Sequence, residues 1–195
     1  MTTRDHIVAS AAQLFYRQGY EHTSFADIAG AVQISRGNFY YHFKTKDKIL
    51  NAVIAARMSD TKQMLDQWQA ESENPEGRIR SFIHILIANR AKIRRFGCPV
   101  GTLTTELAKL NHASHAGASE LFTLFRTWLR AQFSALGSGK QADRLAMHIL
   151  ARSQGVAMLA SVFGDDTFIR REVSEMCDWL ASVTDSACSD NQENN

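Results

Sequence analysis

The sequence predicts an all-α protein, and three observations lead to this expectation. Only two prolines, Pro75 and Pro99, occur in 195 residues, and proline is the residue that most strongly interrupts a helix. Apolar residues recur at intervals of three and four, which is the spacing of a buried helix face. No segment shows convincing alternation of apolar and polar residues, the pattern of a half-buried strand. We therefore expect about nine helices and no sheet.

The first third of the chain is predicted to form three helices, of which the second and third make a helix-turn-helix. Apolar spacing over residues 7–15 predicts a first helix that ends near Gly19. Ser24 suits the start of a second, short helix, and Asp27, three residues later, can complete a capping box. Ser35 suits the start of a third. Two short helices joined by so tight a turn are typical of a helix-turn-helix unit.

The remaining chain predicts longer helices separated by polar or glycine-containing breaks. They are expected after Thr45, over 79–93, from Pro99, over 121–133, over 142–163 and over 168–188. The polar ending SDNQENN predicts a disordered tail. We expect a helix-turn-helix domain over 1–48, a larger helical domain over 49–188 and the tail over 189–195.

Composition narrows the class of protein. With 45% hydrophobic and 22% charged residues the chain is globular, while its net charge of +2 is too small to indicate a nucleic-acid partner by itself. The start of the chain does not resemble a signal peptide, and we expect no membrane-spanning segment. Three widely spaced cysteines do not form a disulfide framework. A reduced, cytoplasmic protein is predicted.

The third predicted helix carries an unusual run of aromatic residues. Tyr40, Tyr41 and His42 are consecutive, and neighbouring helix positions point about 100° apart, so at least one must face outward. An ordinary helical corner would share the helix-turn-helix pattern, but the surrounding charge favours a nucleic-acid partner. Between positions 36 and 48 one acid, Asp47, accompanies four basic residues: Arg36, Lys44, Lys46 and Lys48.

Two runs carry a more specific signal: G-Y-x-x-T-S-F-x-x-I-A over Gly19–Ala29 and S-R-G-N-F-Y-Y-H-F-K-T-K over Ser35–Lys46. Together they resemble the DNA-binding domain of the TetR family of bacterial repressors, over residues 5–50. The resemblance implies that the helix over 36–42 enters the major groove. It further implies that Phe39 and Phe43 belong to the core.

The same resemblance assigns the DNA contacts. Arg36, Asn38 and Tyr41 would approach bases or adjacent phosphates, and the small size of Gly37 would let the helix come close. Ala26 stands where some relatives add a base contact, and it has no hydrogen-bonding group. Contacts with the DNA backbone are implied for Thr23, Ser24, Tyr40, His42 and Lys46.

For the rest of the chain the resemblance implies a domain that binds a small-molecule inducer and forms a homodimer, with operator DNA as the partner. The dimer would use the last two helices. A ligand pocket needs apolar walls and a few polar anchors, although an aromatic stripe is also the pattern of plain core. Candidate lining residues are Phe82, Leu86, Leu103, Phe122, Phe125, Trp128 and Met158, with Glu106 or His84 as anchor.

Cys98 raises an alternative mechanism. It lies between Gly97 and Pro99 at the expected start of a helix, close in sequence to Arg94 and Arg95. A helix N-terminus and neighbouring positive charge both favour a thiolate. The segment resembles that of TetR-like regulators that include sensors of electrophiles or oxidants. A thiol-based repressor is therefore the second hypothesis, against the simpler reading of a small residue at a tight turn.

Enzyme and metal chemistry have little support. The strings G-x-G-x-x-G, Walker A, H-E-x-x-H and G-x-S-x-G are absent, so we expect neither catalysis nor a cofactor. His112 and His115 could touch one metal ion but lack evident partners, so no metal site is expected. The leading hypothesis is a TetR-like repressor released by an inducer. A helical enzyme or scaffold that reuses the motif without binding DNA is the third hypothesis.

Overall fold

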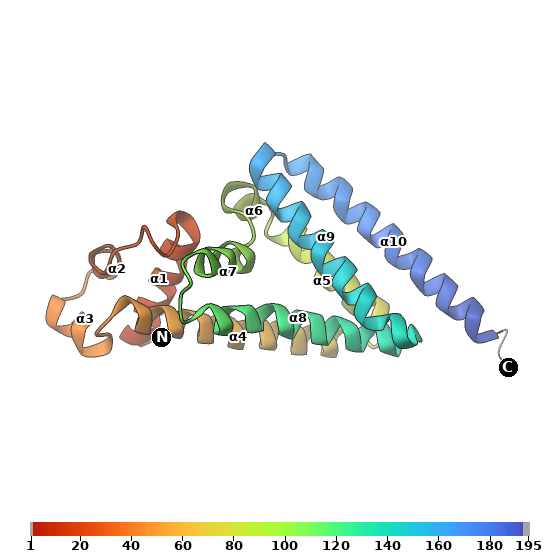
Figure 1. Cartoon of the computed structure of the whole chain (residues 1–195), viewed down its shortest axis with the longest axis horizontal. Coiled ribbons are helices and arrows are strands. Elements are labelled where there is room, and N and C mark those ends of the chain that lie inside the picture. Colours follow the sequence, from red (N-terminus) through yellow and green to blue (C-terminus); the bar gives the residue numbers. More distant parts are fainter. Residues whose placement is uncertain (1, 193–195) are drawn as a thin grey trace. The chain divides into compact units, whose positions relative to one another are not determined.

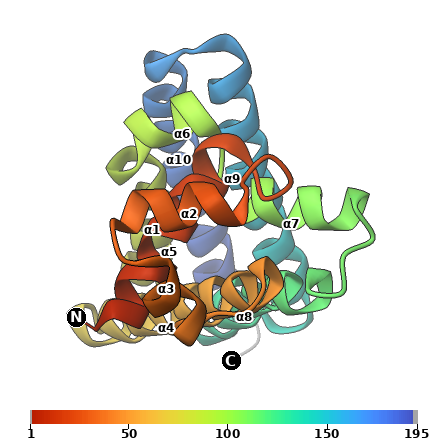
Figure 2. The same ribbon diagram turned by 90° about the vertical axis from the view of Figure 1, so that its left-hand side faces the viewer.

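A computed structural model describes the backbone of residues 2–192 and the side chains of residues 2–185. This part of the chain contains ten α-helices, one 3-10 turn and no strand (Figures 1 and 2). The all-α prediction is confirmed. The helices are α1 Thr3–Gln18, α2 Phe25–Val32, α3 Arg36–His42, α4 Lys46–Glu71, α5 Pro75–Ala88, α6 Arg90–Phe96, α7 Pro99–Lys109, α8 His115–Ala135, α9 Ala142–Phe163 and α10 Asp166–Gln192, with the 3-10 turn at Gly139–Gln141.

Local sequence signals set most of these boundaries. Thr2 and Ser24 each form a capping box, at the starts of α1 and α2. The Thr45 hydroxyl accepts the backbone N–H of Lys48 at 3.2 Å and so caps α4. The predicted helix over 79–93 divides at Asn89 into α5 and α6. This division accounts for a tenth helix where about nine were expected.

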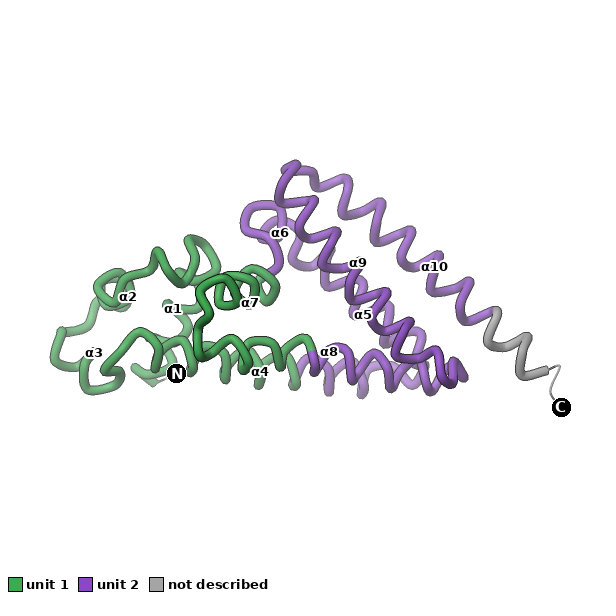
Figure 3. The backbone as a smooth tube through the Cα atoms, viewed as in Figure 1, with its two compact units in different colours: residues 1–62, 99–122 green, residues 63–98, 123–195 purple. Residues whose placement is uncertain are grey.

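The described chain forms two compact units (Figure 3). Unit 1 holds residues 1–62 and 99–122, and unit 2 holds residues 63–98 and 123–195. Unit 1 therefore contains α1 to α3, the first part of α4, all of α7 and the beginning of α8. It is larger than the 1–48 segment expected to bind DNA, because α7 and α4 supply part of its core.

The core of unit 1 joins residues that are far apart in sequence. Side chains from α1, α2, α3, α4, α7 and α8 pack in one cluster, including Ile7, Phe15, Ile28, Phe39, Ile49, Leu50, Leu103, Leu107 and Ala118. Phe39 is fully buried and Phe43 is 4% exposed, in line with the core role that the sequence suggested. Burying apolar surface in this way is the main stabilising contribution to such a unit.

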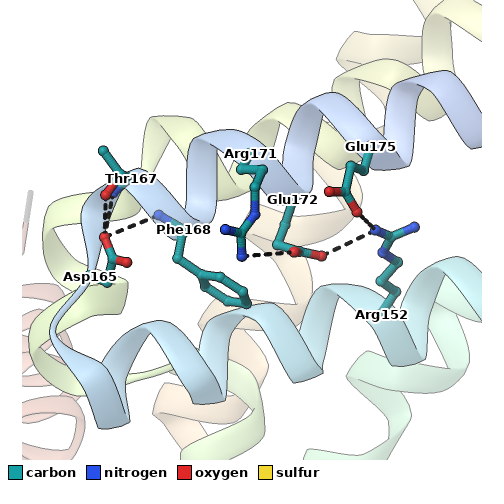
Figure 4. A network of polar contacts seen from close by, with 7 residues as sticks. All are labelled: Arg152, Asp165, Thr167, Phe168, Arg171, Glu172 and Glu175. Carbon is teal, nitrogen blue, oxygen red and sulfur yellow. Dashed lines mark hydrogen bonds and ion pairs between the residues drawn. The ribbon is translucent and has the colours of Figure 1, made fainter.

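In unit 2, α9 packs against α5, α6 and α10. The Asp165 carboxylate caps α10 by accepting the N–H groups of Thr167 at 2.8 Å and Phe168 at 3.1 Å (Figure 4). Arg152 of α9 bridges to Glu172 at 3.1 Å and Glu175 at 2.8 Å of α10 (Figure 4). These pairs tie the two long helices to each other.

Two features of the second half bear on the sequence expectations. Residues 189–192, which the sequence assigned to a disordered tail, form the end of α10, while residues 193–195 of that predicted tail lie outside the described part. The segment Gly139–Phe163, which includes α9, is long and apolar enough to cross a membrane by length and composition alone. It is weak evidence for a membrane span, because the core helix of a soluble protein meets the same test and α9 packs on three other helices.

Candidate nucleic-acid interface

The turn between α2 and α3 has the geometry of a helix-turn-helix. Gln33 ends α2 in the left-handed conformation, with φ of 54°, which reverses the chain within a few residues. The Ser35 hydroxyl then accepts the backbone N–H of Asn38 at 3.3 Å and starts α3. At the other end of α2, Asp27 accepts the Ser24 N–H at 2.7 Å. Bonding to Ser24 lowers the pKa of the Asp27 carboxyl.

The inner face of α3 is anchored by aromatic packing on α2. The rings of Phe25 and Phe39 meet edge to face with centroids 4.8 Å apart, a favoured arrangement for aromatic pairs. Tyr40 lies beside the same Phe25 ring at 5.1 Å and is 38% exposed. The buried anchor therefore fixes the rotation of α3 about its own axis.

The outer face of α3 presents polar groups to solvent. Tyr41 is 79% exposed, and Arg36, Gly37 and Asn38 are exposed as well. The Arg36 guanidinium lies 5.8 Å from the centre of the Tyr40 ring. A Cβ atom added to Gly37 would have no neighbour within 4 Å. This face combines a guanidinium, a carboxamide and a phenol on a narrow helix, the groups that contact base edges and phosphates in a major groove.

Among the residues expected to contact the DNA backbone, Thr23 is corrected by the structure. Its side chain is fully buried, and its hydroxyl donates to the Gly19 carbonyl at 2.6 Å. A side chain in this position cannot reach a phosphate, so its assignment to the DNA surface is wrong. Ser24 is exposed; its oxygen accepts the Asp27 N–H at 3.0 Å and its hydroxyl hydrogen can still serve a phosphate.

Lys46 and His42, also expected to contact the DNA backbone, are only partly exposed. The Lys46 ammonium donates to the Tyr20 carbonyl at 3.0 Å and lies 4.1 Å from the centre of the Tyr20 ring. Lys46 is half-buried, so one of its three N–H donors is used within unit 1 and its contact with the DNA backbone stays a prediction. His42 is half-buried, with its ring 5.2 Å from that of Tyr41.

Other basic side chains surround α3. The guanidinium of Arg4, at the start of α1, lies 5.2 Å from the centre of the Phe43 ring and is exposed. Sequence reasoning missed it because it stands one residue before the segment that carries the motif. Lys44 and Lys48 are exposed as well. Their place beside the end of α3 and the start of α4 suits contacts with phosphates.

The candidate pocket residues are divided between the two units. Phe82 and Phe125 pack edge to face in unit 2 at 5.6 Å, with Leu86 also buried there, and Trp128 packs on Trp68 at 5.9 Å. Leu103, Glu106 and Phe122 belong to unit 1.

Two members of the candidate pocket set need correction. Met158 is 60% exposed on α9 and so lines no pocket within its own chain. The Glu106 carboxylate accepts the backbone N–H groups of Tyr20 and Glu21 and is committed to them rather than directed to a ligand. His84, the other suggested anchor, is exposed, with its Nδ1 atom 2.7 Å from the Arg80 carbonyl oxygen.

The cysteines and histidines show no metal site in the described residues, where no group of three or more possible ligands occurs. His112 Nε2 lies 3.2 Å from the Tyr20 hydroxyl, and His115 Nε2 lies 3.3 Å from the Ser119 hydroxyl. Cys98 is half-buried directly before α7, whereas Cys177 is buried and its burial raises the pKa of its thiol.

The chain, and the helix-turn-helix segment in particular, is similar to known proteins. Residues 7–53 match the model of bacterial regulatory proteins of the tetR family. A helix-turn-helix-type transcriptional regulator from the lacX 3′ region of Lactococcus lactis subsp. lactis is 29% identical over 167 residues, 84% of this chain and 85% of that protein. The transcriptional repressor DhaR of Mycobacterium sp. strain GP1 is 25% identical over 165 residues, 80% of each chain.

A solved structure extends the likeness over nearly the whole fold. The TetR transcriptional regulator of Legionella pneumophila is 26% identical, with a TM-score of 0.79 over 90% of this chain and 96% of that chain. The helix-turn-helix geometry and these matches define a DNA-binding transcriptional regulator, not an enzyme. The family match covers both sequence runs, so the resemblance to the TetR family that they suggested is confirmed for the DNA-binding domain.

The open space at Gly37 gives a first prediction. Gly37→Ala should stabilise the folded protein by about 0.5–1 kcal/mol, because alanine is the better helix former and meets no neighbour. The added methyl group should nevertheless weaken DNA binding if α3 lies in the groove. Thermal unfolding and fluorescence anisotropy on a selected operator measure the two effects.

Gly30→Ala is the matched control, since Gly30 is an exposed helical glycine of α2 with no neighbour within 4 Å of an added Cβ. It should stabilise the protein without the loss of affinity. Equal operator affinity in Gly37→Ala and wild type would contradict the orientation assigned to α3.

Proposed function

We propose that this regulator is a homodimeric repressor that binds a pseudo-palindromic operator and is released by a small-molecule inducer. The observation that carries the proposal is the outer face of α3, where Tyr41 stands in solvent above a fully buried Phe39. Two such helices, one from each subunit, would enter successive major grooves about 34–36 Å apart. The site of action would be the cytoplasm, where the DNA lies.

The exposed face of α9 supports a dimer. Five large apolar side chains of this helix are exposed: Met147, Met158, Leu159, Val162 and Phe163. Contiguous apolar patches on a soluble protein usually mark an interaction surface. A second copy of this chain is the occupant we propose, because a two-fold operator requires paired readers.

Small residues would let the two copies of α9 approach closely. Ala151 and Gly155 stand four and eight positions after Met147 and so continue its stripe along the helix. A Cβ atom added to Gly155 has no neighbour within 4 Å in the single chain. Arg152, beside this stripe, is held by Glu172 and Glu175 of α10, so the ion pairs keep α9 and α10 together as one surface.

The dimer gives a second prediction. Val162→Glu should convert the dimer to a monomer, because it places a charge in a patch where Val162 is 69% exposed and Phe163 73% exposed. Light scattering after size exclusion measures the mass. Operator affinity should fall when the dimer is lost, since a monomer binds only one half-site. Thr127→Glu, an exposed position of α8, is the control and should remain dimeric; a wild-type monomer would contradict the proposal.

Release by an inducer would work through a shift in population. A ligand that binds more tightly to a conformation with a different spacing of the two α3 helices shifts the population toward that conformation. The largest fall in operator affinity it can cause is set by the ratio of its affinities for the two conformations. The buried aromatic side chains of unit 2, among them Phe82 and Phe125, favour an apolar or aromatic inducer. The name of the related DhaR as a repressor also supports repression as the mode of action.

Operator selection tests the DNA-reading assignment and gives a third prediction. Wild-type protein should enrich a pseudo-palindrome from random duplexes. Arg36→Ala should lose about 1–3 kcal/mol of specific binding and tolerate other bases at one position of each half-site. Lys44→Ala should weaken binding to all sequences alike and lower the salt slope by about one. Failure of the wild type to enrich any sequence, or unchanged specificity in Arg36→Ala, would refute the assignment.

Cys98 supplies a second candidate function, because it is more accessible than the buried Cys177. If a thiol sensor releases the operator, diamide or N-ethylmaleimide should dissociate the wild-type complex but not that of Cys98→Ser. Cys177→Ser, the control, should respond as the wild type does. Identical responses of all three proteins would leave the reversible inducer as the mode of release.

A further inference from the structure

The turn between α1 and α2 is bound by a carboxylate from α7. The backbone N–H of Tyr20 donates to Glu106 Oε2 at 2.9 Å, and the next N–H, that of Glu21, donates to Glu106 Oε1 at 2.9 Å. Both oxygens of one carboxylate thus accept consecutive backbone groups that lie 86 and 85 residues away in sequence. Hydrogen bonds to an ionised carboxylate are shorter and stronger than neutral ones.

The backbone at this turn is shaped for the carboxylate. Gly19 has φ of +88°, a conformation that side chains rarely adopt. A Cβ atom at Gly19 would lie 2.9 Å from Glu106 Oε1 and 3.3 Å from Oε2. Only glycine lets the carboxylate come this close to the turn. The glycine that ends α1 therefore also serves a long-range contact.

Tyr20 extends the same connection to two further elements. Its carbonyl accepts from the Lys46 ammonium at 3.0 Å, and its hydroxyl donates to Asp47 at 2.6 Å, both at the start of α4. Its hydroxyl also lies 3.2 Å from His112 Nε2, in the turn before α8. Burial and the bond to Asp47 raise the pKa of Tyr20, so this hydroxyl stays protonated and remains a donor.

The His112 ring is held in one tautomer by its own turn. Nδ1 accepts the backbone N–H of Ser114 at 3.0 Å, so in the neutral ring the proton is on Nε2, which can donate to the Tyr20 hydroxyl. The rings of Tyr20 and His112 pack edge to face at 5.0 Å. Every polar atom of Tyr20 is therefore used within unit 1, and the α1–α2 turn cannot shift without breaking several of these bonds.

We propose that Glu106 is a positioning residue for operator binding: by holding the Tyr20 and Glu21 amides it fixes the α1–α2 turn, and with it α2 and α3. The turn leads through the buried Thr23 into α2, and α2 orients α3 through Phe25 and Phe39. Glu106 acts through the backbone and contributes no DNA contact of its own. This inference rests on the DNA-binding role of α3.

The proposal is tested with the full-length variant Glu106→Gln. The amide keeps the size of the side chain but presents an NH₂ group to one of the two backbone N–H groups. Operator affinity should fall about tenfold or more, the amount expected when a hydrogen bond to a charged group is lost. The salt slope should stay at the wild-type value, because no phosphate contact is removed. The operator affinity of Glu106→Asp should lie between those of the wild type and Glu106→Gln.

Hydrogen exchange supplies a readout that does not depend on DNA. In the wild type, the amides of Tyr20 and Glu21 should exchange as slowly as those inside α1, although they lie in a turn. In Glu106→Gln both should exchange about tenfold faster or more, while the interior of α1 is unchanged. Glu120→Gln, which removes an exposed carboxylate of α8 in the same unit, should alter neither exchange nor affinity.

Several results would overturn the proposal. They are fast exchange of the two amides in the wild type, wild-type affinity in Glu106→Gln, a lower salt slope in that variant, or a loss of affinity explained by its unfolded fraction alone. If Glu106→Gln does not fold, the wild-type exchange and Glu106→Asp decide. If the wild type binds no selected duplex, the DNA-binding role of α3 is refuted instead. The exchange measurement would then still show whether Glu106 holds the amides of Tyr20 and Glu21.

Discussion

The burial of Phe39 is the constraint on which the proposed DNA-reading surface depends. Its ring is fully buried against Phe25, and a helix of seven residues cannot turn about its axis while that contact holds. Because successive residues point about 100° apart, Tyr41 must then face solvent, with Gly37 on the same side. The outward face of α3 is therefore a consequence of packing rather than of its own polarity.

A second constraint keeps α2 and α3 in place within unit 1. The elements proposed to read DNA are continuous in sequence, but the structure that supports them is not, because α7 contributes Leu103 and Leu107 to the core and Glu106 to the α1–α2 turn. Charged hydrogen bonds give that support directional geometry, whereas apolar packing alone is less specific in orientation. This arrangement explains why the compact unit extends well beyond the residues that carry the family motif.

Local features could be predicted from the sequence, and long-range polar partners could not. The caps at Ser24 and Ser35 and the stop at Gly19 depend on neighbours within three or four residues, and the family resemblance implied the inward face of Phe39 and Phe43. Thr23 and Lys46 were assigned to the DNA backbone and Glu106 to a ligand pocket, since an isolated sequence does not tell whether a polar group is used inside the protein. Met158 fits the spacing of a buried face, but no neighbouring helix of its own chain covers it.

The proposed contact between the outer face of α3 and operator bases can be tested by site-specific photocrosslinking. A benzophenone amino acid replaces Tyr41, which is 79% exposed, and the irradiated complex is mapped on the selected duplex. We expect crosslinks at bases within each half-site, and none from the same probe at Thr127 on α8. Intact operator binding with no crosslink from position 41, or crosslinks outside the half-sites only, would contradict it.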